Sequence, residues 1–205
     1  LRLERGDIHG ILGANGSGKS TLLRVMSGVL CPEEGAVELC GKPLGALSRR
    51  EAARMVAMVL PESGRDLPFR VGALVLLGRA PYLGDLAWEG PEDFRIARDA
   101  MAMAGVAHLA DRWFDELSLG ERQRVLVAQG LAQEPRVLLL DEPVAHLDIR
   151  HQVEIHALLE RLARDKRMCV VAVSHDLNLA AEFCDRLVVL SGGRIMQVGP
   201  PLELY

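Results

Sequence analysis

An eight-residue segment near the start of the chain has the composition of a phosphate-binding loop. It reads Gly13-Ala14-Asn15-Gly16-Ser17-Gly18-Lys19-Ser20 and matches G-x-x-x-x-G-K-[ST] in full. Glycines let the backbone curl so that successive N–H groups point at phosphate oxygens, and a following helix adds its positive end. We expect Lys19 to neutralise the β- and γ-phosphates and the Ser20 hydroxyl to ligate Mg²⁺. The predicted ATP contacts are Gly13, Asn15, Gly16, Ser17, Gly18, Lys19, Ser20 and Thr21.

Two adjacent carboxylates follow an apolar run further along the chain. Residues 137–140 are Val, Leu, Leu and Leu, and Asp141 and Glu142 come directly after them. Open α/β sheets place their ligand chemistry at the carboxyl ends of strands. We therefore expect Asp141 to hold Mg²⁺ through water and Glu142 to orient or deprotonate an attacking water. Together with the loop, these residues predict a nucleoside triphosphate site that needs Mg²⁺.

Short apolar runs alternate with longer helical patterns, as in βαβ units around a mostly parallel sheet. Several runs are apolar throughout, which is typical of strands covered on both faces. A turn signal at Ser191-Gly192-Gly193-Arg194 predicts an antiparallel hairpin, so one edge of the sheet should be mixed. The expected strands are residues 8–12, 55–60, 137–140, 168–173, 187–190 and 195–198.

The pattern changes between Glu62 and about Gln133, where strand-like runs give way to helical segments punctuated by Pro and Gly. Pro91 after Gly90, with acids next, predicts a helix start. Ala97, Met101 and Ala104 then fall on one helical face. We predict a helical subdomain at residues 62–133, inserted into an α/β core made of residues 1–61 and 134–205.

Composition restricts the class of protein. The chain has 205 residues, is 49% hydrophobic and carries a formal net charge of -4, which argues against disordered and disulfide-scaffold classes and against a nucleic-acid partner. The four cysteines form no Cys-x-x-Cys pair, so we expect reduced, buried thiols. No apolar run approaches the roughly 18 residues of a membrane span, so a membrane role needs a partner that supplies the spans.

Three further motifs give the chain a family resemblance. Residues 117–124, Leu-Ser-Leu-Gly-Glu-Arg-Gln-Arg, resemble the signature L-S-G-G-[QE]-x-Q-R of ABC transporter ATP-binding subunits. Residues 145–148 resemble the D-loop of that family, and His175 resembles its switch histidine. The resemblance covers essentially the whole chain and implies a phosphate-loop NTPase fold with a RecA-like core. We expect the remaining histidines to be packed or solvated, namely His9, His108, His146, His151 and His156.

The resemblance also implies how the motifs work. Two such subunits pack head to tail, so that ATP on Lys19 of one is closed over by the signature motif of the other. His175 is implied to contact the γ-phosphate and help fix the attacking water. The implied partner-facing residues are Leu117, Ser118, Leu119, Gly120 and Glu121 of the signature, and Leu147 and Asp148 of the D-loop. The implied partners are a second ATP-binding subunit in a homodimer, a transmembrane permease and, indirectly, a substrate-binding protein, at the cytoplasmic face of the cell membrane.

Residues 75–84, 174–180 and 199–201 are similar to importers of iron-siderophores, haem and cobalamin. An ATPase that powers such an importer is the first hypothesis. A soluble ABC-type ATPase acting on DNA or ribosomes is the second, although no coiled-coil insertion, second ATP domain or basic stripe appears. A nucleotide-binding subunit without turnover is the third.

Three departures from the family pattern bear on activity. Glu62 stands where the family has a glutamine that reaches Mg²⁺ and the attacking water. A carboxylate can still ligate Mg²⁺ but adds negative charge near the γ-phosphate, so we expect Glu62 to slow hydrolysis. Leu119 replaces a glycine and either obstructs close approach of the partner or points away. Members of the family usually have an earlier strand and an aromatic residue that stacks on adenine. No aromatic residue precedes Phe69, so we expect adenine recognition to be missing or supplied differently.

Overall fold

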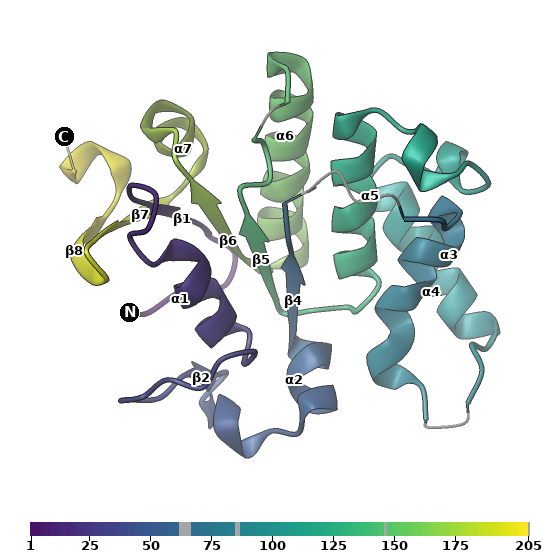
Figure 1. Cartoon of the computed structure of the whole chain (residues 1–205), viewed down its shortest axis with the longest axis horizontal. Coiled ribbons are helices and arrows are strands. Elements are labelled where there is room, and N and C mark those ends of the chain that lie inside the picture. Colours follow the sequence, from purple (N-terminus) through teal and green to yellow (C-terminus); the bar gives the residue numbers. More distant parts are fainter. Residues whose placement is uncertain (62–66, 85–86, 146, 205) are drawn as a thin grey trace.

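The computed structural model describes residues 1–61, 67–84, 87–145 and 147–204. Within these ranges, one sheet has the strand order β4-β5-β6-β1-β7-β8, and β8 is antiparallel to β7 while the other neighbours are parallel. The predicted mixed, mostly parallel sheet is therefore confirmed (Figure 1). Its strands are β1 (Ile8–Leu12), β4 (Val56–Val59), β5 (Val137–Asp141), β6 (Cys169–Ser174), β7 (Arg186–Ser191) and β8 (Arg194–Gly199), and a small hairpin adds β2 (Glu38–Leu39) and β3 (Lys42–Pro43).

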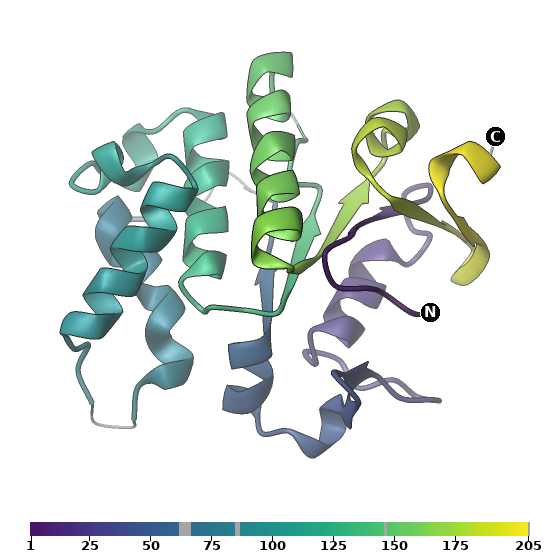
Figure 2. The same ribbon diagram turned by 180° about the vertical axis from the view of Figure 1, so that it is seen from behind.

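Helices cover both faces of the sheet. Helix α1 (Lys19–Met26) lies in front of the sheet in Figure 1, and α6 (Ile149–Lys166) and α7 (Leu177–Phe183) cover the other face, which Figure 2 turns toward the reader. The side chains of β5 show why its sequence is apolar throughout. Leu139 belongs to the apolar cluster that includes Leu23 of α1, whereas Leu138 and Leu140 belong to the cluster on the opposite face. Alternate residues of a strand point to opposite faces, so a strand covered twice needs no polar side.

A group of helices packs beside β4. It contains α3 (Val71–Leu76), α4 (Pro91–Met103) and α5 (Leu119–Leu131), which contact one another, and α5 also packs against β4 (Figure 1). Helix α4 begins at Pro91 as predicted, and Ala97, Met101 and Ala104 are all buried. Short 3₁₀ turns complete the chain at Leu44–Ala46, Leu77–Tyr82, Ala107–Leu109, Phe114–Glu116 and Pro201–Glu203.

Within this helical group, a buried arginine links α4 to the C-terminal end of α5. The Arg79 side chain is 5% exposed and donates from Nε to Asp93 Oδ1 at 2.9 Å and from Nη1 to Glu134 Oε2 at 2.8 Å. Nη1 also donates to the Ala132 carbonyl, and the guanidinium lies 3.9 Å from the ring centroid of Tyr82. The amide of Gly90 and the Arg79 guanidinium hold the pKa of Asp93 below its usual range. Two carboxylates and a carbonyl thus converge on one buried cation.

Two expectations need correction. Met55 ends helix α2 (Arg49–Met55), and the strand that we expected over residues 55–60 is the shorter β4. A capping box at Ser48 and Glu51 starts α2, and the helix continues directly into the strand. The four cysteines are free, but only Cys169 is buried; Cys184 is half-buried, and Cys31 and Cys40 are exposed. Burial raises the pKa of the Cys169 and Cys184 thiols to about 12.

The burial of His156 should make the stability of the folded chain depend on pH. Its ring stacks on Phe183 with centroids 4.0 Å apart, and burial lowers its pKa to about 4 from an ordinary 6.5. The unfolded chain takes up this proton first as the pH falls. The contribution of His156 to stability is therefore fully present above pH 6.5. Acidification through pH 4 lowers the free energy of unfolding by about 3 kcal/mol, at 1.36 kcal/mol per pKa unit.

This effect is measured by chemical denaturation of the parent and of His156→Leu between pH 7 and 4. We expect the difference between their free energies of unfolding to change by about 3 kcal/mol over that range. Subtracting the variant removes the contributions of acidic groups common to both. Parallel stability curves would show that His156 does not carry the titration.

Candidate functional site

The loop after β1 folds around its own lysine. Gly16 and Gly18 have φ of 77° and 101°, which side chains rarely adopt, and a Cβ on Gly13 would lie 2.5 Å from Ser17 Oγ. Lys19 Nζ donates to the carbonyls of Gly13 at 2.7 Å and Ala14 at 3.1 Å. The loop geometry therefore holds the ammonium group inside the curve of the backbone, at the start of α1.

The turn of the β7–β8 hairpin supports this loop from outside. The amide of Gly193 donates to the Ser17 carbonyl at 3.1 Å, and a Cβ on Gly18 would lie 3.8 Å from the Gly193 Cα. Gly192 and Gly193 both have positive φ, as the predicted turn requires. This contact joins elements that lie far apart in the sequence.

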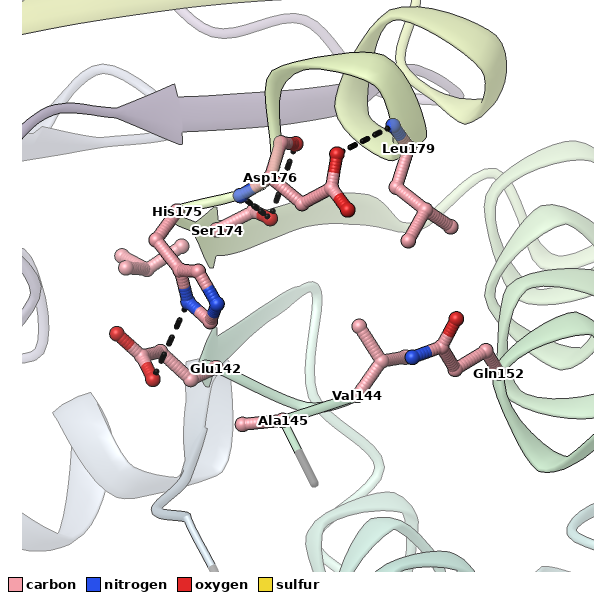
Figure 3. Close-up of a pocket in the computed structure, with 9 residues that line it drawn as sticks. Glu142, Val144, Ala145, Gln152, Ser174, His175, Asp176 and Leu179 are labelled. Atoms are coloured by element: carbon pink, nitrogen blue, oxygen red, sulfur yellow. Dashed lines mark hydrogen bonds and ion pairs between the residues drawn. The ribbon is translucent and has the colours of Figure 1, made fainter. Parts of the chain in front are cut away.

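The predicted acid and histidine meet at the ends of two neighbouring strands. Because β5 and β6 are parallel, the residues that follow them lie at the same edge of the sheet. His175 Nδ1 lies 3.6 Å from Glu142 Oε2 (Figure 3). Both line a cavity of about 110 Å³, together with Val144, Ala145, Gln152, Val173, Ser174, Asp176 and Leu179.

The backbone fixes both side chains. Glu142 has a φ of 49°, a left-handed conformation that costs a non-glycine residue roughly 1–2 kcal/mol. On the other side, the Asp176 amide donates to Ser174 Oγ at 3.0 Å, and Asp176 Oδ1 accepts from the amides of Asn178 and Leu179 at the start of α7. His175 thus projects from a hydrogen-bonded turn.

The predicted Mg²⁺ ligands offer the right chemistry. Asp141 ends β5 and is 8% exposed, and Ser20 lies in the first turn of α1, a helix that contacts β5. Carboxylate and hydroxyl oxygens are hard donors of the kind Mg²⁺ prefers. No cluster of three or more His, Cys, Asp or Glu side chains with metal-binding geometry occurs among the described residues. Mg²⁺ usually keeps several waters and binds substrate phosphates beside one or two protein oxygens, so this small donor set is compatible with the ion.

The signature motif lies apart from the loop within one chain. The motif begins α5, which stands in the helical group beside β4 and away from α1 (Figures 1 and 2). Ser118 caps α5, and Glu121 Oε2 accepts from the Ser118 amide at 2.9 Å and hydroxyl at 2.8 Å, which lowers the pKa of Glu121. Leu119 is 47% exposed, so about half of the residue faces away from its own chain. Ser118 and Leu119 are thus presented outward.

Two residues of the first turn of α6 belong to the same region and were not predicted. Gln152 lines the cavity and donates to the Leu147 carbonyl at 3.0 Å, and His151 Nδ1 lies 2.8 Å from Asp148 Oδ1. We had expected His151 to be merely packed or solvated. The signal available in the sequence was the spacing of Asp148 and His151, which places an N-cap acid opposite the third residue of the helix.

Some predicted residues cannot be placed. Glu62 and His146 lie outside the described residues. Among the helices described, none combines the length and apolar character needed to cross a membrane.

The fold and the site together define a phosphate-loop nucleoside triphosphatase. Residues 1–145 match the family of ABC transporters. The chain is 45% identical over 203 residues to the hemin import ATP-binding protein HmuV of Gloeobacter violaceus, covering 96% of this chain and 73% of that protein. It is 43% identical over 196 residues to the cobalamin import ATP-binding protein BtuD of Halobacterium salinarum, covering 96% of this chain and 49% of the relative. The chain belongs to the ABC transporter ATP-binding proteins, a family of ATPases.

Solved structures agree with this assignment. CbiO1 of Clostridium perfringens, part of the ABC transporter complex cbiONQ, superposes with a TM-score of 0.88 at 30% identity, covering 100% of this chain and 81% of that one. The ATP-binding cassette MJ0796, in a dimeric post-hydrolysis state with ADP and Pi, superposes with a TM-score of 0.82 at 28% identity, covering 98% and 88%. The predicted fold class is confirmed.

Proposed function

We propose that this chain binds and hydrolyses MgATP as the cytoplasmic, membrane-associated subunit of an importer for a metal chelate, of the haem, cobalamin or iron-siderophore type. It acts as a head-to-tail homodimer beneath a permease that receives cargo from a binding protein. Similarity to a hemin and a cobalamin import protein supports the cargo class. The observation that carries the chemistry is the approach of Glu142 to His175 at the edge of the sheet that holds Asp141.

In this proposal each site residue has one role. Lys19 and the amides of residues 13–21 bind the phosphates, and Ser20 and Asp141 hold Mg²⁺, with Glu62 as a further oxygen donor. Glu142 accepts a proton from the attacking water, and His175 contacts the γ-phosphate. When bound, Mg²⁺ neutralises charge that develops on the phosphate oxygens. Ser118 and Gly120, with Leu117, Leu119 and Glu121 around them, and the D-loop residues Leu147 and Asp148 complete the site of the partner subunit.

The test is ATP turnover of the purified chain, measured alone and with co-purified permease subunits. We expect slow turnover when the chain is dilute and monomeric, and faster turnover in the assembly, because closure of two subunits completes each site. Equal turnover in both states would contradict the head-to-tail arrangement. ATP binding without hydrolysis in either state would favour the alternative of a regulatory, nucleotide-binding subunit.

We also propose that Glu62 and Leu119 reduce turnover. The resemblance to the family implies that residue 62 reaches Mg²⁺ and the attacking water, and a carboxylate there would add a negative charge that an amide does not. Leu119 supports the proposal through its exposure, because its side chain stands at the helix N-terminus that would approach the partner's ATP. The two effects are separable, since the first acts on chemistry and the second on association.

Restoring the family residue at each position is therefore expected to raise activity. Glu62→Gln should increase turnover about threefold or more, equal to about 0.6 kcal/mol at the barrier, without changing ATP-induced dimerisation. Leu119→Gly should instead strengthen ATP-induced dimerisation, measured by light scattering. Glu160→Gln, an exposed acid on α6 outside the site, controls for loss of one charge. Unchanged or lower turnover of Glu62→Gln would contradict the proposed effect of Glu62. Dimerisation of Leu119→Gly equal to that of the parent would contradict the proposed effect of Leu119.

A further inference from the structure

The ring of His151 occupies the space beside the glycine of the signature motif. A Cβ built on Gly120 would lie 2.5 Å from His151 Cγ and 2.9 Å from Nε2, and closer still to Cδ2. Real Cβ atoms essentially never approach so closely, so the two residues are in direct contact and a side chain at position 120 would require the His151 ring to move. Gly120 belongs to α5 and His151 to α6, so this contact crosses from one helix to the other.

The same ring is held by the D-loop. His151 Nδ1 lies 2.8 Å from Asp148 Oδ1, and the Asp148 carboxylate also accepts from the His151 amide at 2.9 Å. These hydrogen bonds lower the pKa of Asp148, so its carboxylate is ionised and can only accept. The proton of this contact therefore sits on Nδ1 of His151. One side chain thus donates to the D-loop with one atom and packs on the signature glycine with its opposite edge.

Two further contacts support the same arrangement. Gln152 donates to the Leu147 carbonyl at 3.0 Å, which fixes the D-loop from the next residue of α6. Further along, Arg124 Nη1 of α5 lies 2.8 Å from Glu154 Oε2 of α6, and both side chains are more than half-buried. The N-terminal halves of α5 and α6 are thereby tied together.

We propose that His151 is a positioning residue that couples the signature motif to the D-loop, so that the two segments which a chain offers to its partner's ATP move as one unit. The statement that these segments contact the partner's ATP rests on the proposed function. The coupling between them does not, because the ring contact and the hydrogen bond are both within one chain. Removing the ring frees Gly120 and the D-loop from each other.

Amide hydrogen exchange of the nucleotide-free chain tests the coupling directly, read in peptides that cover residues 117–124 and 145–150. His151→Ala should speed exchange in both segments by about tenfold, the usual consequence of losing a hydrogen bond to a charged group. His151→Phe keeps the ring and loses the donor, so it should speed exchange mainly in the D-loop. His151→Asn keeps an N–H near the position of Nδ1 and loses the ring, so it should speed exchange mainly in the signature.

Val153→Ala, an exposed substitution in the next turn of α6, serves as the matched control and should change neither segment. Faster exchange in the D-loop alone after His151→Ala would overturn the coupling. In the assembly with permease subunits, we expect His151→Ala to lower turnover about tenfold while the affinity of the chain for ATP stays within about twofold. If the parent has no turnover, the proposed function fails, and the exchange data still decide the coupling.

Discussion

Glu142→Gln is expected to lower ATP turnover by about 10²- to 10⁴-fold, the usual contribution of a general base. Glutamine has nearly the same shape as glutamate but cannot accept a proton from water at neutral pH. The substitution also removes a negative charge near the γ-phosphate, so affinity for ATP should stay equal or increase. Turnover is measured by phosphate release, and affinity by titration with a fluorescent ATP analogue.

The structure explains why this carboxylate in particular carries the effect. Glu142 is held in a left-handed backbone conformation and lies 3.6 Å from His175 Nδ1 (Figure 3). Asp141 is instead buried at the end of β5. The two adjacent acids therefore have different surroundings, one suited to a metal and the other to a water. Glu160→Gln, the same chemical change on the exposed side of α6, is the control and should have normal turnover. If the turnover of Glu142→Gln stayed within tenfold of the parent, another residue would have to be the general base.

Arg79→Met should destabilise the chain by about 3–5 kcal/mol, the cost of removing one partner from a buried ion pair. Methionine fills much of the arginine volume but removes the guanidinium hydrogen bonds to the Asp93 carboxylate and the Ala132 carbonyl. Asp93, whose side chain is 16% exposed, keeps the hydrogen bond from the Gly90 amide. Tyr82, which also donates to the Gln133 carbonyl at 2.9 Å, loses the guanidinium against its ring. The free energy of unfolding by urea measures the loss.

Arg95→Met is the matched control for this prediction. Arg95 also pairs with two carboxylates, those of Glu92 and Asp99, but its side chain is 56% exposed. Solvent screens such pairs, so the control should lose less than about 1 kcal/mol. Equal losses for the two variants would mean that burial of Arg79 does not determine its contribution. Since the hydrogen-bond partners of Arg79 are not site residues, nucleotide affinity of the folded Arg79→Met chain should be unchanged.

Local patterns in the sequence were enough to predict several features. Residues 137–140 and 168–173 identified buried strands because they are apolar throughout, and a strand covered on both faces needs no polar side. Pro91 after Gly90 identified the start of α4, and two adjacent glycines identified the hairpin turn at residues 191–194. Each of these signals acts over a few residues, where backbone preference alone decides the conformation. The prediction that a strand begins at residue 55 was wrong, because the capping box at Ser48 starts a helix whose last residue is Met55.

The sequence by itself determined the residue types of the site: a phosphate loop with Lys19, a pair of carboxylates at Asp141 and Glu142, and His175 after a strand. Only the tertiary structure decided which of them meet. Parallel pairing of β5 and β6 brings Glu142 to His175, and packing of α5 on α6 brings His151 to Gly120. Burial of Arg79 and His156 was likewise decided by packing between segments distant in the chain. The physical reason is that residue spacing reports local backbone preference, whereas contact between separate elements depends on how their side chains fill shared space.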